Sequence, residues 1–162
     1  MMPARDQWAT HGIAQGFART FHKPADLVLA CRIGVFLWRI PRRLDRQPLD
    51  RLLSDLGTES RDVSSDLHSD VRRISRLRQA WLASPLFRAR NTCYIRALTL
   101  FRFLSDDGRS PPVRIHFGVE PGTEPGDRVR GHAWVTVGEE VLEAPEPLLA
   151  GRVSELYAFP AR

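Results

Sequence analysis

The sequence predicts an α+β domain in which several helices precede a small antiparallel sheet. Up to about residue 104, apolar residues recur at intervals of three and four, which is typical of amphipathic helices. After two consecutive prolines at 111 and 112 the interval changes to two, which is typical of half-buried strands. Because the helical patterns come first and the strand patterns follow, we expect an antiparallel sheet with helices packed against it, and not an alternating parallel fold.

Two helices are expected in the first third of the chain. Pro24 suits the first position of a helix, and Pro41 is expected to end or kink it. The apolar residues that predict its buried face are Leu27, Val28, Cys31, Val35 and Trp38. A second helix is expected from near Pro48 to a stop at Gly57, with its apolar face formed by Leu49, Leu52, Leu53 and Leu56.

The middle of the chain predicts a linker and two more helices. The polar, serine-rich stretch 58–69 reads as a linker, and helix is expected again over 70–83. The next helix starts at Cys93, where Asn91 or Thr92 can serve as its cap. Its apolar positions have helical spacing: Tyr94, Ala97, Leu98, Phe101 and Leu104.

The last third of the chain predicts the sheet. Strict alternation indicates a strand over 113–119, and a loop rich in Pro and Gly follows. Residues 132–137 and 140–143 are expected to form a hairpin across Gly138-Glu139, where glycine in the first turn position favours a type II′ turn. The tail after Pro145 is mixed, with a possible short helix over 152–157.

Composition limits the domain organisation and the partners. A chain of 162 residues predicts one domain, which we divide into a weakly ordered segment (1–23), a helical region (24–69) and a core (70–162). The net charge of +5 would attract acidic partners, but no zinc-finger, single-strand-binding or helix-turn-helix signature indicates a nucleic-acid partner. The most apolar stretch, 27–40, is too short to span a membrane and carries two arginines.

Two cysteines stand in different settings. Cys31 lies in mid-helix among apolar residues and is interpreted as a small buried side chain, whereas Cys93 opens a helix. No secretory signal or cysteine pattern indicates disulfides, so a reducing, cytoplasmic location is expected. No cluster of cysteine and histidine indicates a structural metal, and no cofactor is expected.

Cys93 and His132 are the candidate nucleophile and base of a thiol enzyme. Backbone N–H groups at a helix start and a nearby imidazole both favour the thiolate, which is the form of cysteine that attacks a carbonyl carbon. His132 opens a strand, and a base there can reach a thiol at the start of a helix packed on the sheet. The following Trp134 is expected to shape a water-poor substrate cleft.

Two further groups complete the predicted site. The hairpin register places Glu143 diagonally from His132, so Glu143 is the candidate that orients the imidazole, with Glu146 as the alternative if the strand bulges. The oxyanion donors are expected to be the backbone N–H of Cys93 and the side chain of Asn91, which can equally be only a helix cap.

These residues resemble a known family over about residues 24–147. The paired N-terminal helices, Cys-x-x-x-Ala-Leu from Cys93, Ile-x-Phe-Gly-Val from Ile115 and His-Ala-Trp-Val from His132 occur in the order found in the lasso-peptide biosynthesis B protein, a transglutaminase-like, microcin-processing leader peptidase. The resemblance implies a papain/transglutaminase-like core and a Cys-His-Asp triad that cleaves a leader from a ribosomally made precursor peptide. The expected aspartate is not present, because the corresponding position holds Glu143 or Ala144. Either Glu143 replaces it or the triad is incomplete.

The resemblance also implies partners and leaves alternatives open. The partners are the precursor peptide, a separate leader-recognition protein and an asparagine-synthetase-like cyclase that uses ATP. The residues alone are compatible with peptide hydrolysis or with acyl transfer to an amine. The alternative that is not an enzyme is a catalytically silent scaffold that binds the precursor and the cyclase.

Overall fold

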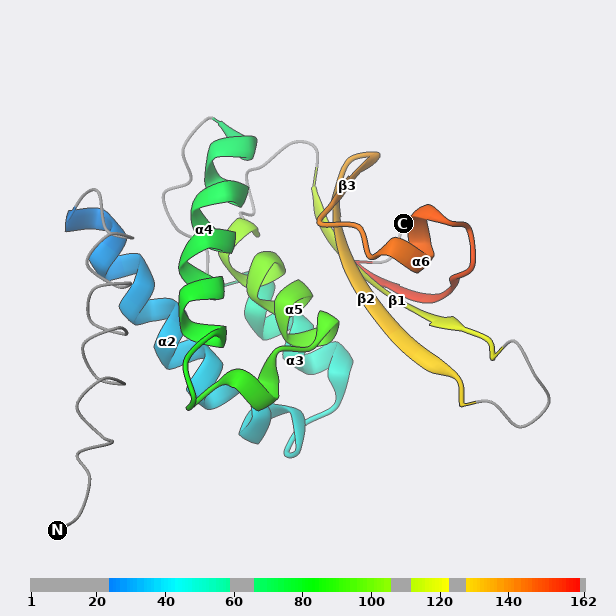
Figure 1. The fold of residues 1–162 in the computed structure, drawn as a ribbon, viewed down its shortest axis with the longest axis horizontal. Coiled ribbons are helices and arrows are strands. Elements are labelled where there is room, and N and C mark those ends of the chain that lie inside the picture. Colours follow the sequence, from blue (N-terminus) through cyan, green and yellow to red (C-terminus); the bar gives the residue numbers. More distant parts are fainter. Residues whose placement is uncertain (1–23, 59–65, 106–111, 123–127, 161–162) are drawn as a thin grey trace, which may run out of the picture.

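The computed structural model describes residues 24–58, 66–105, 112–122 and 128–160, and it has the predicted α+β architecture. Helices α2 to α5 occupy one side of the molecule, and a twisted sheet with the short helix α6 occupies the other, with α5 next to the sheet (Figure 1). In chain order the elements are α2 (Pro24–Leu44), α3 (Leu49–Thr58), α4 (Leu67–Leu82), the 3₁₀ helix η1 (Arg88–Arg90), α5 (Cys93–Leu104), β1 (Val113–Glu120), β2 (Arg130–Val137), β3 (Glu140–Leu142), α6 (Glu146–Leu149) and β4 (Ser154–Phe159).

The sheet is antiparallel throughout, with strand order β3-β2-β1-β4. β1 and β2 pair from Val113 opposite Val137 to Glu120 opposite Arg130. β2 and β3 form the predicted hairpin, because Val137 pairs with Glu140 across a two-residue turn. Gly138 in the first turn position has φ +61°, which glycine adopts without a steric penalty.

α5 connects the helices to the sheet. Its Tyr94 ring lies 5.3 Å from the Phe117 ring of β1, between ring centroids. Ala133, Val135 and Val137 of β2 belong to the same buried core as the helices. The face of the sheet that packs on α5 therefore carries the odd-numbered residues of β1 and β2, and the even-numbered residues face away from α5.

The predicted buried face of α2 is wrong. Leu27, Val28, Val35 and Trp38 are each half exposed or more, and Cys31 is exposed instead of buried. The buried face consists of Ala30, Ile33, Gly34, Leu37 and Ile40. Small residues decide this orientation, because Trp81 of α4 lies directly on Gly34, where an added Cβ would come within 2.6 Å of the ring. The Trp81 Nε1–H also donates to the carbonyl of Ala30 at 2.8 Å.

Several predicted boundaries also differ. α2 continues through Pro41 to Leu44, so Pro41 does not end the helix. α4 begins at Leu67, inside the predicted linker, because Asp66 caps it by accepting a hydrogen bond from the N–H of Ser69 at 3.2 Å. The tail forms strand β4 where a short helix was expected, since its backbone pairs with β1.

Some predictions lie outside the described residues. These are the weakly ordered start at 1–23, most of the linker (59–65) and the centre of the loop at 123–127. Among the helices that the structure describes, none has the length and apolar character needed to cross a bilayer.

Candidate active site

Cys93 is the first residue of α5. Thr92 caps the helix, because its backbone is extended (φ −108°, ψ 157°) and its Oγ1 accepts a hydrogen bond from the N–H of Ile95 at 3.3 Å. The 3₁₀ helix η1 ends at Arg90, so only Asn91 and Thr92 separate it from Cys93. Cys93 therefore lies in the first turn, where backbone N–H groups have no helical acceptor and the helix dipole is positive.

The Cys93 thiol reaches strand β2 one residue before His132. Its Sγ donates to the carbonyl oxygen of Gly131 at 3.6 Å. β3 pairs with β2 only from Val135 to Val137, so in the described part of the chain this end of β2 has a free edge opposite β1. The sulfur therefore sits beside a part of β2 that β3 does not pair with.

His132 is held by a carboxylate that the sequence analysis did not select. Its Nε2 lies 3.3 Å from Oε2 of Glu120, the last residue of β1, and the two side chains are only 13% and 15% exposed. Because an ionised carboxylate only accepts hydrogen bonds, this contact places the imidazole proton on Nε2. In the neutral ring, Nδ1 then has the lone pair that takes up a proton.

A guanidinium group also contacts Glu120. The Nε of Arg152, which follows α6, lies 3.0 Å from Oε1 of Glu120. Glu120 thus uses one oxygen for Arg152 and the other for His132. Such a pair of contacts restrains the carboxylate and, through it, the orientation of the imidazole.

The pleat of the sheet separates His132 from the helical side. His132 pairs with Gly118 and shares its face with Trp134, away from α5. No hydrogen bond joins Cys93 to His132, both of which the structure describes. The structure thus brings the thiol to the backbone next to His132, and it brings the imidazole to Glu120.

A cavity of about 210 Å³ lies beside Cys93. Trp134 and Glu143 also line it, so three of the predicted site residues meet there. Its apolar lining comes from α5 and from the hairpin: Ala97, Leu100, Ala133, Val135 and Leu142. His132 and Asn91 are not among its lining residues.

Glu143 is bound by side chains of α4 and α5. Nη2 of Arg78 donates to both of its oxygens at 2.7 and 2.6 Å, Ser75 Oγ donates to Oε1, and Nη2 of Arg96 lies 3.6 Å from Oε2. Arg78 is 3% exposed and Glu143 is 22% exposed, so this ion pair is largely removed from water. Glu143 also has φ +48°, which turns the chain sharply after β3.

The electrostatics of Glu143 follow from these contacts. Burial alone raises the pKa of this carboxyl, but the Arg78 charge and the hydrogen bonds from Ser75 and Arg78 outweigh it, so the pKa lies below its ordinary value. Glu143 is therefore a clamped carboxylate that joins the end of β3 to the helices. The carboxylate at the imidazole is Glu120 instead.

The remaining predicted residues have defined positions. Asn91 is exposed and follows η1, whereas the cap of α5 is Thr92. The Trp134 ring stacks on the His116 ring, with centroids 5.4 Å apart and planes within 6°. His116 in turn contacts Thr136 at 2.9 Å and Glu155 of β4 at 2.7 Å, and its side chain is 12% exposed.

Sequence reasoning missed Glu120 because its role depends on the pairing register. Alternation alone assigns His116, Gly118 and Glu120 to one face of β1, and an antiparallel partner brings His132 to the same face. The loop between the two strands permits several registers, and only one of them puts Glu120 within reach of His132. Sequence reasoning also missed Arg78. Its position four residues after Ile74 and three before Trp81 places it on the apolar face of α4, and this spacing is the signal that could have found it.

The comparisons with known proteins identify a family. A family model described as the transglutaminase-like superfamily matches residues 27–156. No curated protein and no solved structure matches the chain. The matched span begins in α2, includes Cys93 and His132 and ends in β4. With most of its length covered, the chain belongs to the transglutaminase-like superfamily.

Proposed function

We propose that this protein is a cysteine endopeptidase that removes the leader from a ribosomally made precursor peptide during lasso-peptide maturation. The observation that carries the proposal is the position of Cys93, at a helix start and 3.6 Å from the β2 carbonyl that precedes His132. The resemblance to the B protein family supplies the substrate class. The implied partners are a separate leader-recognition protein and an asparagine-synthetase-like cyclase.

The chemistry proceeds in two steps. Cys93 Sγ transfers its proton to Nδ1 of His132 and attacks the carbonyl carbon of a peptide lying along the free edge of β2. The backbone N–H of Cys93, with Asn91 as a second donor, stabilises the oxyanion. His132 then protonates the departing amine, which leaves a thioester that water hydrolyses to free acid and thiol.

In this mechanism Glu120 is the positioning residue for His132. Its contact with Nε2 leaves Nδ1 as the basic nitrogen, and Arg152 holds the carboxylate in place. The ring must turn toward the β2 edge for Nδ1 to accept the thiol proton. Glu143, which the sequence favoured for the orienting role, supports the wall of the cavity through Arg78.

The decisive experiment measures cleavage of the precursor peptide by mass spectrometry, with the leader-recognition partner present. Cys93→Ala is expected to abolish cleavage, a loss of more than about a thousandfold. Cys31→Ser is the matched control, because Cys31 is exposed and lies on a different helix, and its cleavage rate is expected to stay near that of the wild type. Full activity of the Cys93 variant would refute the proposal that the protein is a cysteine peptidase.

One observation favours the second candidate, a catalytically silent scaffold. The thiol donates to a backbone carbonyl, and the described side chains of Cys93 and His132 form no hydrogen bond. Iodoacetamide labelling at pH 7 separates the two candidates. Accessibility alone predicts that the exposed Cys31 reacts faster than the half-exposed Cys93. If the protein is a peptidase, Cys93 is expected to react faster than Cys31, because an activated thiolate reacts faster than an exposed thiol. Faster labelling of Cys31 would support the catalytically silent scaffold.

Hydrolysis and acyl transfer share the thioester. If an amine reaches the thioester before water, the product is an amide of that amine instead of a free carboxylic acid. Cleavage in the presence of a small primary amine, followed by mass measurement of the leader fragment, distinguishes them. The peptidase predicts mainly the free acid.

A further inference from the structure

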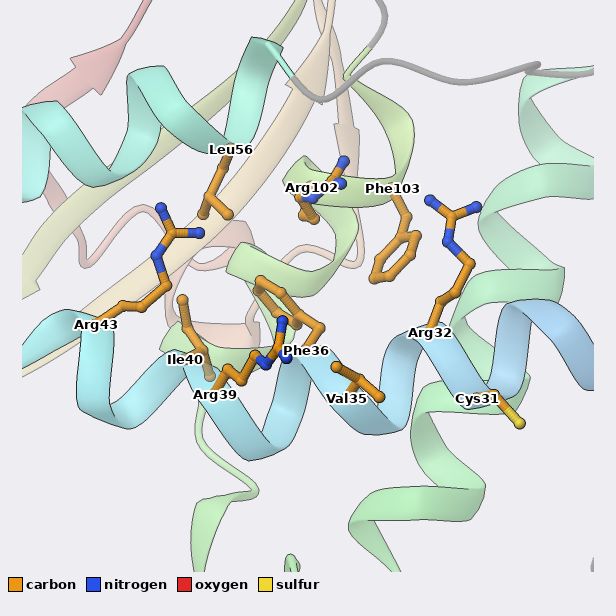
Figure 2. A pocket seen from close by; sticks show the side chains of 10 residues that line it. All are labelled: Cys31, Arg32, Val35, Phe36, Arg39, Ile40, Arg43, Leu56, Arg102 and Phe103. Carbon is orange, nitrogen blue, oxygen red and sulfur yellow. The ribbon is translucent and has the colours of Figure 1, made fainter.

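Two hollows lie beside α5, and a cysteine lines each of them. The larger one, of about 390 Å³, lies between α2, the end of α3 and the last turn of α5. Figure 2 shows that its cysteine, Cys31, points away from the Phe36 and Phe103 rings at its centre. The smaller one is the cavity of about 210 Å³ beside Cys93. A group that enters this smaller cavity therefore lies next to the candidate nucleophile.

The floor of the cavity beside Cys93 is apolar. Ala97 and Leu100 follow Cys93 by four and seven residues, so the three share one face of α5. Ala133 and Val135 line it from β2, on the face of the sheet that packs on α5. Each of these four floor residues is 5% exposed or less. The cavity thus joins the thiol to a hydrocarbon surface between α5 and the sheet.

The charged residues that line this cavity already have partners. Arg78 donates to both oxygens of Glu143, and Arg96 lies 3.6 Å from the same carboxylate. Glu146 lies 2.9 Å from Arg152. Every charged side chain among the described lining residues is therefore balanced within the protein. A charged occupant would lose its hydration without gaining a countercharge, which is unfavourable, so these pairs select an uncharged occupant.

Small residues set the size of the cavity. Ala97, Ala133 and Ala144 line it from α5, from β2 and from the segment after β3. An apolar cavity of about 150 Å³ holds a benzene ring. A volume of about 210 Å³ therefore admits one side chain of the size of Leu or Phe. A larger residue in place of one of these alanines would fill part of that space.

We propose that the cavity beside Cys93 binds one uncharged, apolar side chain of the substrate, of about the size of Leu or Phe, from a residue next to the bond that Cys93 attacks. This inference rests on the proposed function, because that function makes the occupant a part of the peptide substrate. It also names the class of that side chain and assigns the selection of its size to Ala97, Ala133 and Ala144.

The test measures alkylation of the wild-type protein, which requires neither cleavage nor the precursor. Sγ displaces iodide from iodoacetamide or from N-benzyliodoacetamide, and mass spectrometry of the digested protein gives the rate at each cysteine. The ratio of the rates, benzyl reagent over iodoacetamide, is expected to be about tenfold higher at Cys93 than at Cys31, because burial of a phenyl ring in the cavity is favourable. N-(2-carboxyethyl)iodoacetamide, which carries a charge, is expected to show no such increase at Cys93.

Variants of the lining alanines test where the ring binds. Ala97→Leu fills the cavity from α5 and Ala144→Leu fills it from the segment after β3, and each is expected to lower the ratio at Cys93 to about its value at Cys31. Ala97 is buried, so Ala144→Leu at a partly exposed position decides the test if Ala97→Leu does not fold. Ala150→Leu is the matched control, at an exposed position outside the cavity, and is expected to keep the wild-type ratio.

The outcomes separate this proposal from the proposed function. Equal ratios at Cys93 and Cys31 in the wild type, or equal ratios at Cys93 in Ala144→Leu and Ala150→Leu, would overturn the apolar occupant even if Cys93→Ala abolishes cleavage. A larger increase with the charged reagent than with the benzyl reagent would overturn it as well. A raised ratio at Cys93 together with full cleavage by Cys93→Ala would refute the peptidase, and with it the assignment of the occupant to a substrate.

Discussion

Glu120 and Glu143 are two partly buried carboxylates that differ in their hydrogen-bond and ion-pair partners. Glu143 receives Arg78 on both oxygens and a further hydrogen bond from Ser75, so its acceptor capacity is used within the scaffold. Glu120 receives one guanidinium on one oxygen and contacts an imidazole with the other. The comparison teaches that the hairpin register around His132, from which Glu143 was predicted, does not select the carboxylate partner of this candidate base. The donors that surround each carboxylate do.

The largest effect is expected for the ion pair between Arg78 and Glu143, and it is an effect on stability. Arg78→Met removes the buried guanidinium and leaves Glu143 with Ser75 and Arg96. Removing one partner of a buried pair is expected to lower the free energy of unfolding by about 3 kcal/mol or more. Urea denaturation measures it, with Arg72→Met on the exposed face of the same helix as control, for which a change within about 0.5 kcal/mol is expected. Equal stabilities of the two variants would show that the Arg78–Glu143 ion pair contributes little to the free energy of unfolding.

The next effect is on the catalytic side. Glu120→Gln keeps the shape of the side chain but removes the charge that stabilises the imidazolium, so kcat/KM for precursor cleavage is expected to fall about a hundredfold. The pH profile of kcat/KM is expected to shift as well, which a purely structural role would not produce. Glu143→Gln is the matched comparison and is expected to keep the wild-type profile. If Glu143→Gln shifts the profile and Glu120→Gln does not, the sequence-based assignment of Glu143 is the right one.

A third prediction concerns how the contribution of Glu143 to stability depends on pH. Because the pKa of Glu143 is lower in the folded protein than its ordinary value of 4.5, its contribution to stability is present above that pH and is lost as the pH falls through the folded pKa. Glu143→Gln is expected to lower the free energy of unfolding by about 2 kcal/mol at pH 7. The difference from the wild type is expected to shrink in urea titrations below pH 4.5. A constant difference across the acid range would contradict the charge-based account.

The smallest effect tests whether the helix cap serves the thiol. Thr92→Ala and Asp66→Ala each remove the side-chain cap of one helix, α5 or α4, and each is expected to cost about 1 kcal/mol of stability. Only Thr92→Ala is expected also to slow the labelling of Cys93 by iodoacetamide, because it loosens the first turn of α5. Equal labelling rates in the two variants would mean that the cap does not position the thiol.

Local sequence patterns determined much of the fold. The strand at β1, the two-residue turn at Gly138 and the apolar spacing of α5 are properties of neighbouring residues, and the structure confirms them. The burial alternation of β1 holds from Val113 to His116 and is lost at Phe117. The cysteine at the helix start follows from the same kind of local information, because Thr92 and the apolar positions after it define where α5 begins.

Only the tertiary structure decided which surfaces meet. α2 has apolar residues on two faces, and the face that packs is the one where Gly34 admits the Trp81 ring, so Cys31 and Val35 remain exposed. In the same way, the register between β1 and β2 brings Glu120 to His132, and the packing of α4 brings Arg78 to Glu143. The physical reason is common to these cases. Periodicity reports what each segment can bury, whereas contacts between distant segments depend on shape and pairing that no single segment encodes.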